Sequence, residues 1–378
     1  MRATIRSAVA LGAIALLATA CGPATRASSP SSKAPSSTAP SSGSAARASS
    51  TGKFVGCMVT DTGGIDDRSF NAASWQGMQE AHAAEPGKIT VTYLQSASSS
   101  NYTPNISTSV GEKCGIIVTV GLLMGNNTEA AAKSHPNQKF AIVDYAYRPP
   151  IKNIDALVFN TVQDGFLGGY LAAGISKSGA VGTFGGEELP TVTIYMDGFW
   201  DGVQYYNQQH HTKVKVLGWN EQTQKGLFTG NFTDQTMGQA AAQALISEGA
   251  DVIFPVAEDA GLGAARAVQA TDAAAGRTKV TMEWADTDGC FSAPQYCRYF
   301  ISSVTQGIQA AVKNAVLNAA NGSFKGGSYV GDLANGGVAL SPFHDLASQV
   351  PASLRSELNT IKAEIVSGQI KPASKSPL

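Results

Sequence analysis

The sequence predicts an α/β protein with parallel sheets, helices on both faces of each sheet, and two lobes. Short apolar segments with the character of buried strands alternate along the chain with segments of helical spacing. Regular alternation of this kind is typical of parallel sheets flanked by helices. The alternation restarts at Ala180, and a length of 378 residues is sufficient for two domains. We therefore expect two lobes, each built on its own sheet.

The expected elements follow from the hydrophobic pattern. Most of the expected strands are short runs rich in apolar residues. These strands span 54–59, 89–94, 115–120, 140–143, 155–159, 180–184, 214–217, 251–256, 279–284, 299–302, 328–332 and 338–340. Each expected helix has apolar residues at spacings of three and four. The first helix begins at Ser69, and the others span 106–114, 126–134, 166–175, 191–208, 236–247, 262–271, 308–320 and 353–367.

The N-terminal residues predict export and attachment to a membrane. Arg2 and Arg6 precede an apolar run at 8–17, which is too short to span a bilayer, so we expect a secretory signal peptide over 1–20. The run LLATAC at 16–21 resembles a bacterial lipobox, in which the cysteine, here Cys21, is lipidated. Lipoboxes usually have Leu where this chain has Ala18.

A Ser/Pro-rich tether is expected to follow over 21–52. Residues 22–51 hold 11 Ser and 4 Pro without an acidic or aromatic side chain, and such a segment cannot bury enough apolar surface to order itself. No further apolar run is long enough to span a bilayer. We expect a soluble body that a lipid holds on the extracytoplasmic face of the cell membrane.

The charge of the chain and its missing motifs exclude several classes of function. Five Lys or Arg and no acidic residue precede residue 52, so the remainder carries a formal charge of −6, against −1 for the whole chain. This acidic balance argues against a nucleic-acid partner. The sequence also has no Gly-x-Ser-x-Gly nucleophile elbow with a partner His, and no phosphate-binding P-loop.

The cysteines beyond the lipobox suggest disulfides. Their even number in an exported chain indicates two bridges. Cys57 and Cys114 lie on or beside two buried strands and could be neighbours, and Cys290 and Cys297 bracket a six-residue loop. The pairing itself stays open. A zinc site is the alternative, but the spacings do not suit one and none of the five His lies beside a Cys. We expect no metal and no cofactor.

The segment 54–78 predicts a ligand site. An apolar strand at 54–59 leads into the turn DTGGIDD at 61–67 and then into a helix. The carboxyl end of a strand and the N-terminus of the next helix converge on the ligand in open α/β sheets. The alternative is an ordinary connection in which Asp or Ser caps the helix. Three Asp and an exposed aromatic residue exceed what capping needs.

These residues resemble a known family. The segment VTDTGGIDDRSFN at 59–71, with WQG at 75–77, resembles the opening motif of the basic membrane protein family. Members are substrate-binding lipoproteins of ABC transporters, and characterised members bind nucleosides. Similar segments follow in the family's order over nearly all of 53–345: FAIVD at 140–144, FN at 159–160, GFLGG at 165–169, MDGFWDGV at 196–203, DVIFPVA at 251–257, GLG at 261–263, WADTD at 284–288 and SSV at 302–304.

The resemblance implies a fold and a function. The fold is the two-lobed type I periplasmic-binding-protein fold, in which the chain crosses between lobes three times. We expect the N-terminal lobe over 53–165 and about 286–325, and the C-terminal lobe over 166–285 and about 326–378. The implied function is capture of a nucleoside, of the purine class in this family, for an ABC permease and its ATPase. The protein is then a monomer and not an enzyme.

The chemistry of a nucleoside indicates which residues bind it. Aromatic rings stack on the flat base, and carboxylates accept hydrogen bonds from the ribose hydroxyls. By resemblance, Phe70 stacks on the base and Phe199 is the matching ring of the second lobe. Phe199 has a core role as its alternative, with Trp200 as the stacking ring. Asp286 receives the ribose hydroxyls, and Asp144 holds the base or sugar edge.

Further residues of the same segments complete the expected site. Asp61 and Asp67 are expected to face the cleft. Ser69 and Asn71 are expected to bond polar edges of the base, although helix capping explains either residue as well. Gly261 lets the backbone approach the ligand or simply starts a helix.

Two departures from the family bear on the ligand. Gln306 stands where members commonly have a Lys that supports the ribose-binding Asp, so charge compensation beside Asp286 is lost. Glu258 and Asp259 replace what is usually a pair of small residues. Added carboxylates next to the cleft disfavour a phosphorylated ligand.

Two other functions compete with transport. The aspartate turn at 61–67 is also similar to the calcium-binding cluster of nucleoside hydrolases. Those enzymes have a further Asp where this chain has Val59, and the extra residue in this turn would displace the carboxylates from octahedral reach. A receptor that reports ligand occupancy to a membrane signalling protein is the other alternative.

Overall fold

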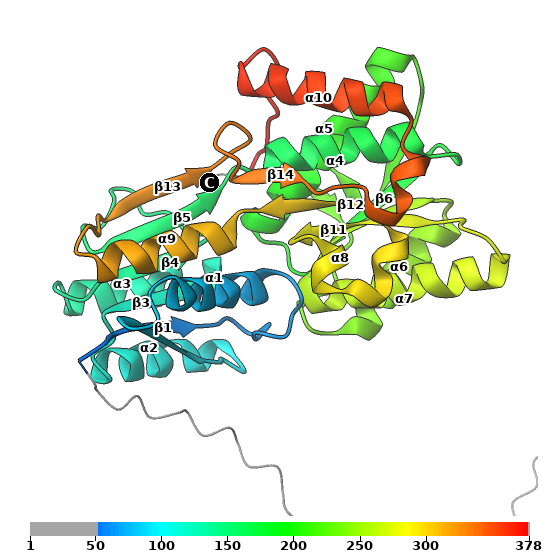
Figure 1. The fold of residues 1–378 in the computed structure, drawn as a ribbon. Coiled ribbons are helices and arrows are strands. Elements are labelled where there is room, and N and C mark those ends of the chain that lie inside the picture. Colours follow the sequence, from blue (N-terminus) through cyan, green and yellow to red (C-terminus); the bar gives the residue numbers. More distant parts are fainter. Residues whose placement is uncertain (1–51, 377–378) are drawn as a thin grey trace, which may run out of the picture. The chain divides into compact units, whose positions relative to one another are not determined.

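The structure, a computed structural model, describes residues 52–376 as two sheets flanked by helices (Figure 1). These residues belong to one compact unit. The expected signal peptide, the lipidated Cys21 and the tether up to residue 51 lie outside the described residues. Among the described helices, none combines the length and the apolar character that crossing a membrane requires.

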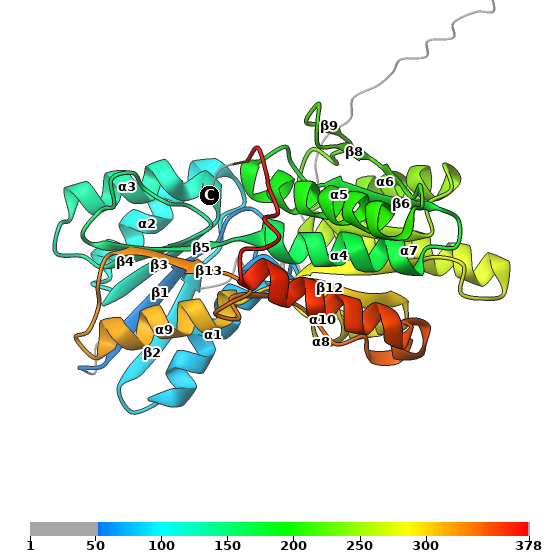
Figure 2. The ribbon, with the colours of Figure 1, turned by 90° about the horizontal axis from the view of Figure 1, so that it is seen from above.

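The first sheet contains six parallel strands in the order β13-β5-β4-β3-β1-β2. The strands are β1 (Phe54–Val59), β2 (Ile89–Leu94), β3 (Ile116–Val120), β4 (Phe140–Val143), β5 (Ile154–Phe159) and β13 (Gly327–Gly331). Every residue of β3 and β4 is buried, as is typical of parallel strands covered on both faces. One face carries α1 (Phe70–Ala84) and α9 (Ile308–Ala320), and the other carries α2 (Tyr102–Gly111) and α3 (Gly125–Ser134), as Figure 2 shows.

The second sheet has the order β14-β12-β11-β10-β6-β7, in which only β14 runs antiparallel to its neighbour. Its strands are β6 (Ala180–Gly185), β7 (Lys215–Leu217), β10 (Val252–Val256), β11 (Thr281–Asp286), β12 (Phe300–Gln306) and β14 (Val338–Leu340). The helices α4 (Thr161–Ile175), α5 (Pro190–His210) and α10 (Ala352–Val366) pack together on one face, and α6 (Gln235–Ser247) and α7 (Glu258–Ala275) cover the other (Figure 1). The short elements are β8 (Trp219–Asn220), β9 (Lys225–Gly226) and α8 (Gly289–Ser292).

Each sheet with its helices forms one lobe, and within the described residues the chain passes between the lobes three times. The passages follow β5, β12 and β13. We call the lobe of the first sheet, which includes α9, the first lobe and the other the second lobe.

The expected lobe limits differ from these sheets in three places. Residues 300–306, expected in the N-terminal lobe, form β12 beside β11 in the second sheet. Residues 327–331, expected in the C-terminal lobe, form β13 beside β5 in the first sheet. The helix α4 begins at Thr161 and packs against α5, so the first passage precedes residue 165. An apolar run identifies a strand, but it does not specify which sheet the strand joins.

Two disulfides occur among the described residues. Cys57 on β1 is bonded to Cys114, which precedes β3, with 5.9 Å between the Cα atoms. Cys290 on α8 is bonded to Cys297, with 4.4 Å between the Cα atoms. The first bridge joins neighbouring strands of one sheet, and the second closes a short loop.

The helices α4 and α5 lie unusually close because glycines line their contact. A side chain on Gly169 of α4 would overlap the carbonyl of Phe199, and a side chain on Gly202 of α5 would overlap the carbonyl of Phe166. Backbone therefore packs directly on backbone along this pair. The contact holds α5 in place, and α5 carries residues of the candidate site described below.

We expect Gly202→Ala to destabilise the protein by about 1–3 kcal/mol, because the added methyl group forces two packed backbones apart. Gly87→Ala is the matched control, since a side chain at that exposed turn position has no neighbour within 4 Å. Chemical denaturation of both variants measures the difference. Equal free energies of unfolding would contradict the close-packing argument.

Candidate ligand-binding site

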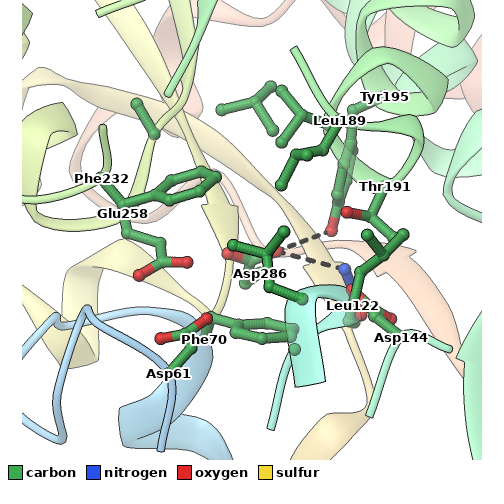
Figure 3. A pocket seen from close by; sticks show the side chains of 16 residues that line it. Asp61, Phe70, Leu122, Asp144, Leu189, Thr191, Tyr195, Phe232, Glu258 and Asp286 are labelled. Atoms are coloured by element: carbon green, nitrogen blue, oxygen red, sulfur yellow. Dashed lines mark hydrogen bonds between the residues drawn. The ribbon is translucent and has the colours of Figure 1, made fainter. Parts of the chain in front are cut away.

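A cavity lies where the carboxyl ends of both sheets meet, the place at which open α/β sheets bind ligands. Both lobes contribute to its wall. The lining residues are Asp61, Phe70, Gly121, Leu122, Leu123, Asp144, Leu189, Thr191, Val192, Tyr195, Phe232, Val256, Ala257, Glu258, Asp286 and Gln306 (Figure 3). Five of these were expected from the sequence: Asp61, Phe70, Asp144, Asp286 and Gln306.

Asp286 is held by both lobes. It ends β11 of the second lobe, and the hydroxyl of Ser69 in the first lobe donates a hydrogen bond to its Oδ2 at 2.6 Å. Its Oδ1 accepts hydrogen bonds from the Tyr195 hydroxyl at 2.9 Å and from Gln306 Nε2 at 3.3 Å. Figure 3 shows the last two bonds as dashed lines. Ser69 therefore contacts Asp286 rather than lining the cavity.

Gln306 ends β12 and takes the position expected for the family's Lys, directly beside Asp286. It donates one hydrogen bond without supplying a positive charge. Its Oε1 atom is buried and has no hydrogen-bond partner. Three hydrogen bonds lower the pKa of the Asp286 carboxyl, but burial has the larger effect and raises this pKa above its usual value.

Three acidic residues of the cavity have left-handed backbone conformations. Asp144 directly follows β4 with φ of 63°, Asp286 ends β11 with φ of 65°, and Glu258 begins α7 with φ of 47°. Residues other than Gly adopt this region infrequently. Such conformations gather at functional sites, where the surrounding structure holds them. Here each one directs a carboxyl group from a strand end or helix start into the cavity.

Asp61 is fixed by the helix that follows it. Its Oδ1 accepts hydrogen bonds from Asn71 Nδ2 at 2.7 Å and from the backbone amide of Gly63 at 3.0 Å. Asn71 also donates a hydrogen bond to Asp67. Its side chain therefore orients both carboxylates, and it is not among the residues that line the cavity.

Asp67 caps α1 instead of facing the cavity. Its Oδ1 accepts the backbone amides of Ser69 and Ala72, and its Oδ2 accepts the backbone amide of Asn71 at 2.6 Å. Only 1% of the residue is exposed. The expectation that Asp67 faces the ligand thus gives way to the capping alternative.

The two aromatic rings of the cavity come from opposite lobes. Phe70 begins α1 in the first lobe, and Phe232 precedes α6 in the second. The ring of Phe232 packs over Gly186, where a side chain would overlap it. Sequence reasoning missed Phe232, although one signal was present. Like Phe70, it is an aromatic residue in a polar turn just before a helix.

The second-lobe rings expected from the sequence lie elsewhere. Phe199 is completely buried in the core, where its ring stacks on Phe254 with 5.4 Å between the centroids. Trp200 is partly buried against the same core cluster. Both side chains belong to α5, which turns Tyr195 toward the cavity instead. Gly261 also lies outside the cavity lining, and it allows α7 to pack against the ring of Trp284.

The cavity is acidic and rich in hydrogen-bond acceptors. Among the described residues that line it, none is Lys, Arg or His. Burial raises the pKa of Asp61 to about 6. Burial, and then the charge of Asp286, raises the pKa of Asp144 well above its usual value. This lining suits an uncharged or cationic ligand with several hydrogen-bond donors and a flat apolar face, and it disfavours a phosphate.

An α/β fold with two lobes and a polar, aromatic cavity between their sheets is typical of solute-binding proteins. Residues 54–373 match the profile described as "ABC transporter substrate-binding protein PnrA-like". The chain therefore belongs to this family, the basic membrane protein (Bmp) family. The family consists of solute-binding proteins of ABC transporters and not of enzymes.

Individual relatives agree with this assignment. The "ABC transporter nucleoside-binding protein BmpA" of Lactococcus lactis subsp. cremoris is 26% identical, covering 84% of this chain and 88% of its own length. An "uncharacterized lipoprotein" of Pyrococcus abyssi is also 26% identical, covering 74% of this chain and 67% of its own. A solved ABC transporter solute-binding protein from Aeropyrum pernix K1 superimposes with a TM-score of 0.75 at 26% identity, covering 86% of this chain and 94% of its own.

A buried carboxyl group lies near the site without lining it. Glu283 of β11 is completely buried, and neither of its carboxyl oxygens has a hydrogen-bond partner. Burial raises its pKa from 4.5 to about 8. The folded protein therefore keeps this proton at pH values at which the unfolded chain has lost it. The resulting contribution to stability is complete below pH 4.5 and is lost as the pH rises through about 8.

We expect Glu283→Gln to flatten the dependence of folding stability on pH between 5 and 8. At pH 8 the buried glutamate costs at most on the order of 4 kcal/mol relative to pH 4.5, and the uncharged amide removes this pH-dependent cost. Urea unfolding at several pH values measures the slope, with the exposed Glu112→Gln as control. Parallel slopes for Glu283→Gln and the parent would show that Glu283 ionises normally in the folded protein.

Proposed function

We propose that this chain is the extracytoplasmic receptor that captures a nucleoside for an ABC importer. The observation that carries the proposal is one cavity with an aromatic ring from each lobe, Phe70 and Phe232, and an acidic strand end, Asp286. Flat rings bind a base by stacking, and a carboxylate accepts hydrogen bonds from a vicinal diol. The Lactococcus lactis relative is named as a nucleoside-binding protein, which supports the same ligand class.

In the proposed complex, the base lies between Phe70 and Phe232, and the ribose hydroxyls lie at Asp286. Asp144 holds a second polar edge of the ligand from the first lobe. Asp286 already accepts three hydrogen bonds, and a carboxylate has about four acceptor positions. Ribose binding therefore fills the remaining position or displaces the Ser69 hydroxyl.

Closure of the lobes follows from these contacts. The ligand touches both lobes only when they are closed, so it shifts the population toward the closed state by its difference in affinity for the two states. The hydrogen bond from Ser69 to Asp286 and that from Trp284 Nε1 to the carbonyl of Arg68 join the same two lobes. These bonds favour closure in the same direction as the ligand.

Attachment and partners complete the proposal. We propose that a lipid on Cys21 anchors a monomeric receptor beside its permease and that a separate ATPase drives import. The lipobox-like segment supports the anchor, and so does the name of the Pyrococcus abyssi relative, a lipoprotein. Metabolic labelling with a fatty-acid probe tests it, and Cys21→Ala must abolish the label.

A panel of purine and pyrimidine nucleosides, free bases and sugars tests the ligand class. Binding raises the unfolding temperature by mass action, so nucleosides should raise it and sugars alone should not. Chromatography of the incubated nucleoside, with calcium added, separates capture from hydrolysis. Intact nucleoside is expected, and released base would identify a hydrolase.

We expect Phe70→Ala and Phe232→Ala each to weaken nucleoside binding by about 1–3 kcal/mol, because each removes one stacking face. Isothermal titration calorimetry measures the affinities. Phe291→Ala is the matched control, since Phe291 is 79% exposed and lies outside this cavity. Parent-like affinity in both cavity variants would place the base elsewhere.

We expect Asp286→Ala to weaken a nucleoside by about 1–3 kcal/mol, the cost of losing hydrogen bonds to a charged acceptor. The same variant should bind the 2′,3′-dideoxynucleoside about as well as the parent does, because that ligand has no diol. The exposed Asp66→Ala serves as control. Equal losses for both ligands would remove Asp286 from the ribose site.

A further inference from the structure

Glu258 brings a carboxyl group from the second lobe to the aspartate turn of the first. It begins α7, immediately beyond the end of β10, and only 8% of the residue is exposed. Figure 3 shows its carboxyl group pointing toward Asp61. A side chain at Gly63 would overlap Glu258 Oε2 and would lie 3.4 Å from Asp61 Oδ1. Two acidic groups from opposite lobes therefore share one end of the cavity.

The carboxyl group of Glu258 lacks a donor. Its Oε2 atom is buried and has no hydrogen-bond partner. The nearby amide of Asn71 already donates to Asp61 and Asp67. Burial, and then the charge of Asp61, raises the pKa of Glu258 well above its usual value.

The hydrogen-bond donors elsewhere in the cavity are bonded to Asp286 and not to Glu258. The Tyr195 hydroxyl and Gln306 Nε2 both donate to Asp286. A buried polar atom without a partner is costly. Because burial raises the pKa of Glu258, its carboxylate form needs donors, and a parallel pair of donors stabilises a carboxylate especially well. This end of the cavity therefore calls for a ligand edge with adjacent N–H groups.

The bases of common nucleosides differ in this respect. Guanine presents its N1–H and its 2-amino group side by side, two donors spaced for one carboxylate. Hypoxanthine has the N1–H alone, and adenine places an acceptor, N1, beside its amino group. Guanosine thus offers the acceptor-rich end of the cavity more donors than inosine or adenosine does.

We propose that Glu258 binds the N1–H and 2-amino edge of a guanine base and makes this receptor selective for guanosine. The inference rests on the proposed nucleoside function and specifies its ligand. Asp61 lies at the same end of the cavity and has one carboxylate oxygen beyond the one that Asn71 and Gly63 occupy. Closure brings Glu258 to the first lobe, so base recognition and lobe closure occur together.

Calorimetric titration with guanosine, inosine and adenosine tests the inference. The parent should bind guanosine at least tenfold more tightly than either competitor. Glu258→Gln replaces one acceptor oxygen by a donor, which opposes guanine but complements the acceptor beside the amino group of adenine. The variant should therefore lose tenfold or more in guanosine affinity and keep adenosine within threefold. Glu188 is exposed and directly precedes Leu189 of the cavity lining, so Glu188→Gln should change neither the guanosine affinity nor the adenosine affinity.

A ligand-side measurement keeps the test independent of how the variant folds. N1-methylguanosine lacks one of the two donors, so the parent should bind it at least tenfold more weakly than guanosine. Nucleoside binding without a guanosine preference, or equal losses for all three nucleosides in Glu258→Gln, overturns this inference alone. Failure of every nucleoside to bind overturns the proposed function together with it.

Discussion

The buried carboxylate of Asp286 is the interaction on which the arrangement of this molecule depends. It lies at the end of a second-lobe strand, yet one of its donors, Ser69, belongs to the first lobe. A buried charge is strongly unfavourable without partners. Separation of the lobes would remove the Ser69 hydrogen bond and expose the group to water. The same carboxylate thereby links the separation of the two lobes to the binding of a ligand in the cavity.

The acidic lining limits the kinds of ligand that suit the cavity. Asp61, Asp144, Glu258 and Asp286 converge without a basic side chain in the lining, and burial raises the pKa of each. Separation of the lobes would let water hydrate these groups. In the closed state a ligand has to replace that water with its own donors. An anionic ligand would add charge repulsion to the cost of lost hydration. An uncharged ligand with many N–H and O–H groups would replace the lost hydrogen bonds without adding repulsion.

Much of the fold follows from the sequence because short apolar runs between helical segments mark strands in both sheets. The runs at 54–59, 89–94, 140–143 and 338–340 coincide with β1, β2, β4 and β14. Local pattern does not specify tertiary pairing, which is why β12 and β13 were expected in the opposite lobes. The hairpin β8–β9 is too short to leave any periodic signal.

The site was predictable where a residue sits at the end of a strand or the start of a helix. Four such residues line the cavity: Asp61, Phe70, Asp144 and Asp286. The end of the strand or the start of the helix directs each side chain toward the cleft. Side chains inside a helix are different, because their direction depends on how the helix is rotated. Phe199 and Tyr195 are four residues apart on α5, and their spacing does not indicate which of the two side chains lines the cavity. The sequence marks Glu258 as a departure from the family pattern, but only the structure shows that its Oε2 atom has no hydrogen-bond partner.

The interleaved path of the chain has a mechanical consequence. The first lobe takes β13 and α9 from sequence that follows five of the second lobe's strands, and the second lobe takes β14 and α10 from sequence that follows β13. No single cut of the backbone can therefore release one lobe intact. A protease that cleaves any one connecting segment leaves two fragments that still share a sheet, so the fragments of this protein should stay associated until they unfold.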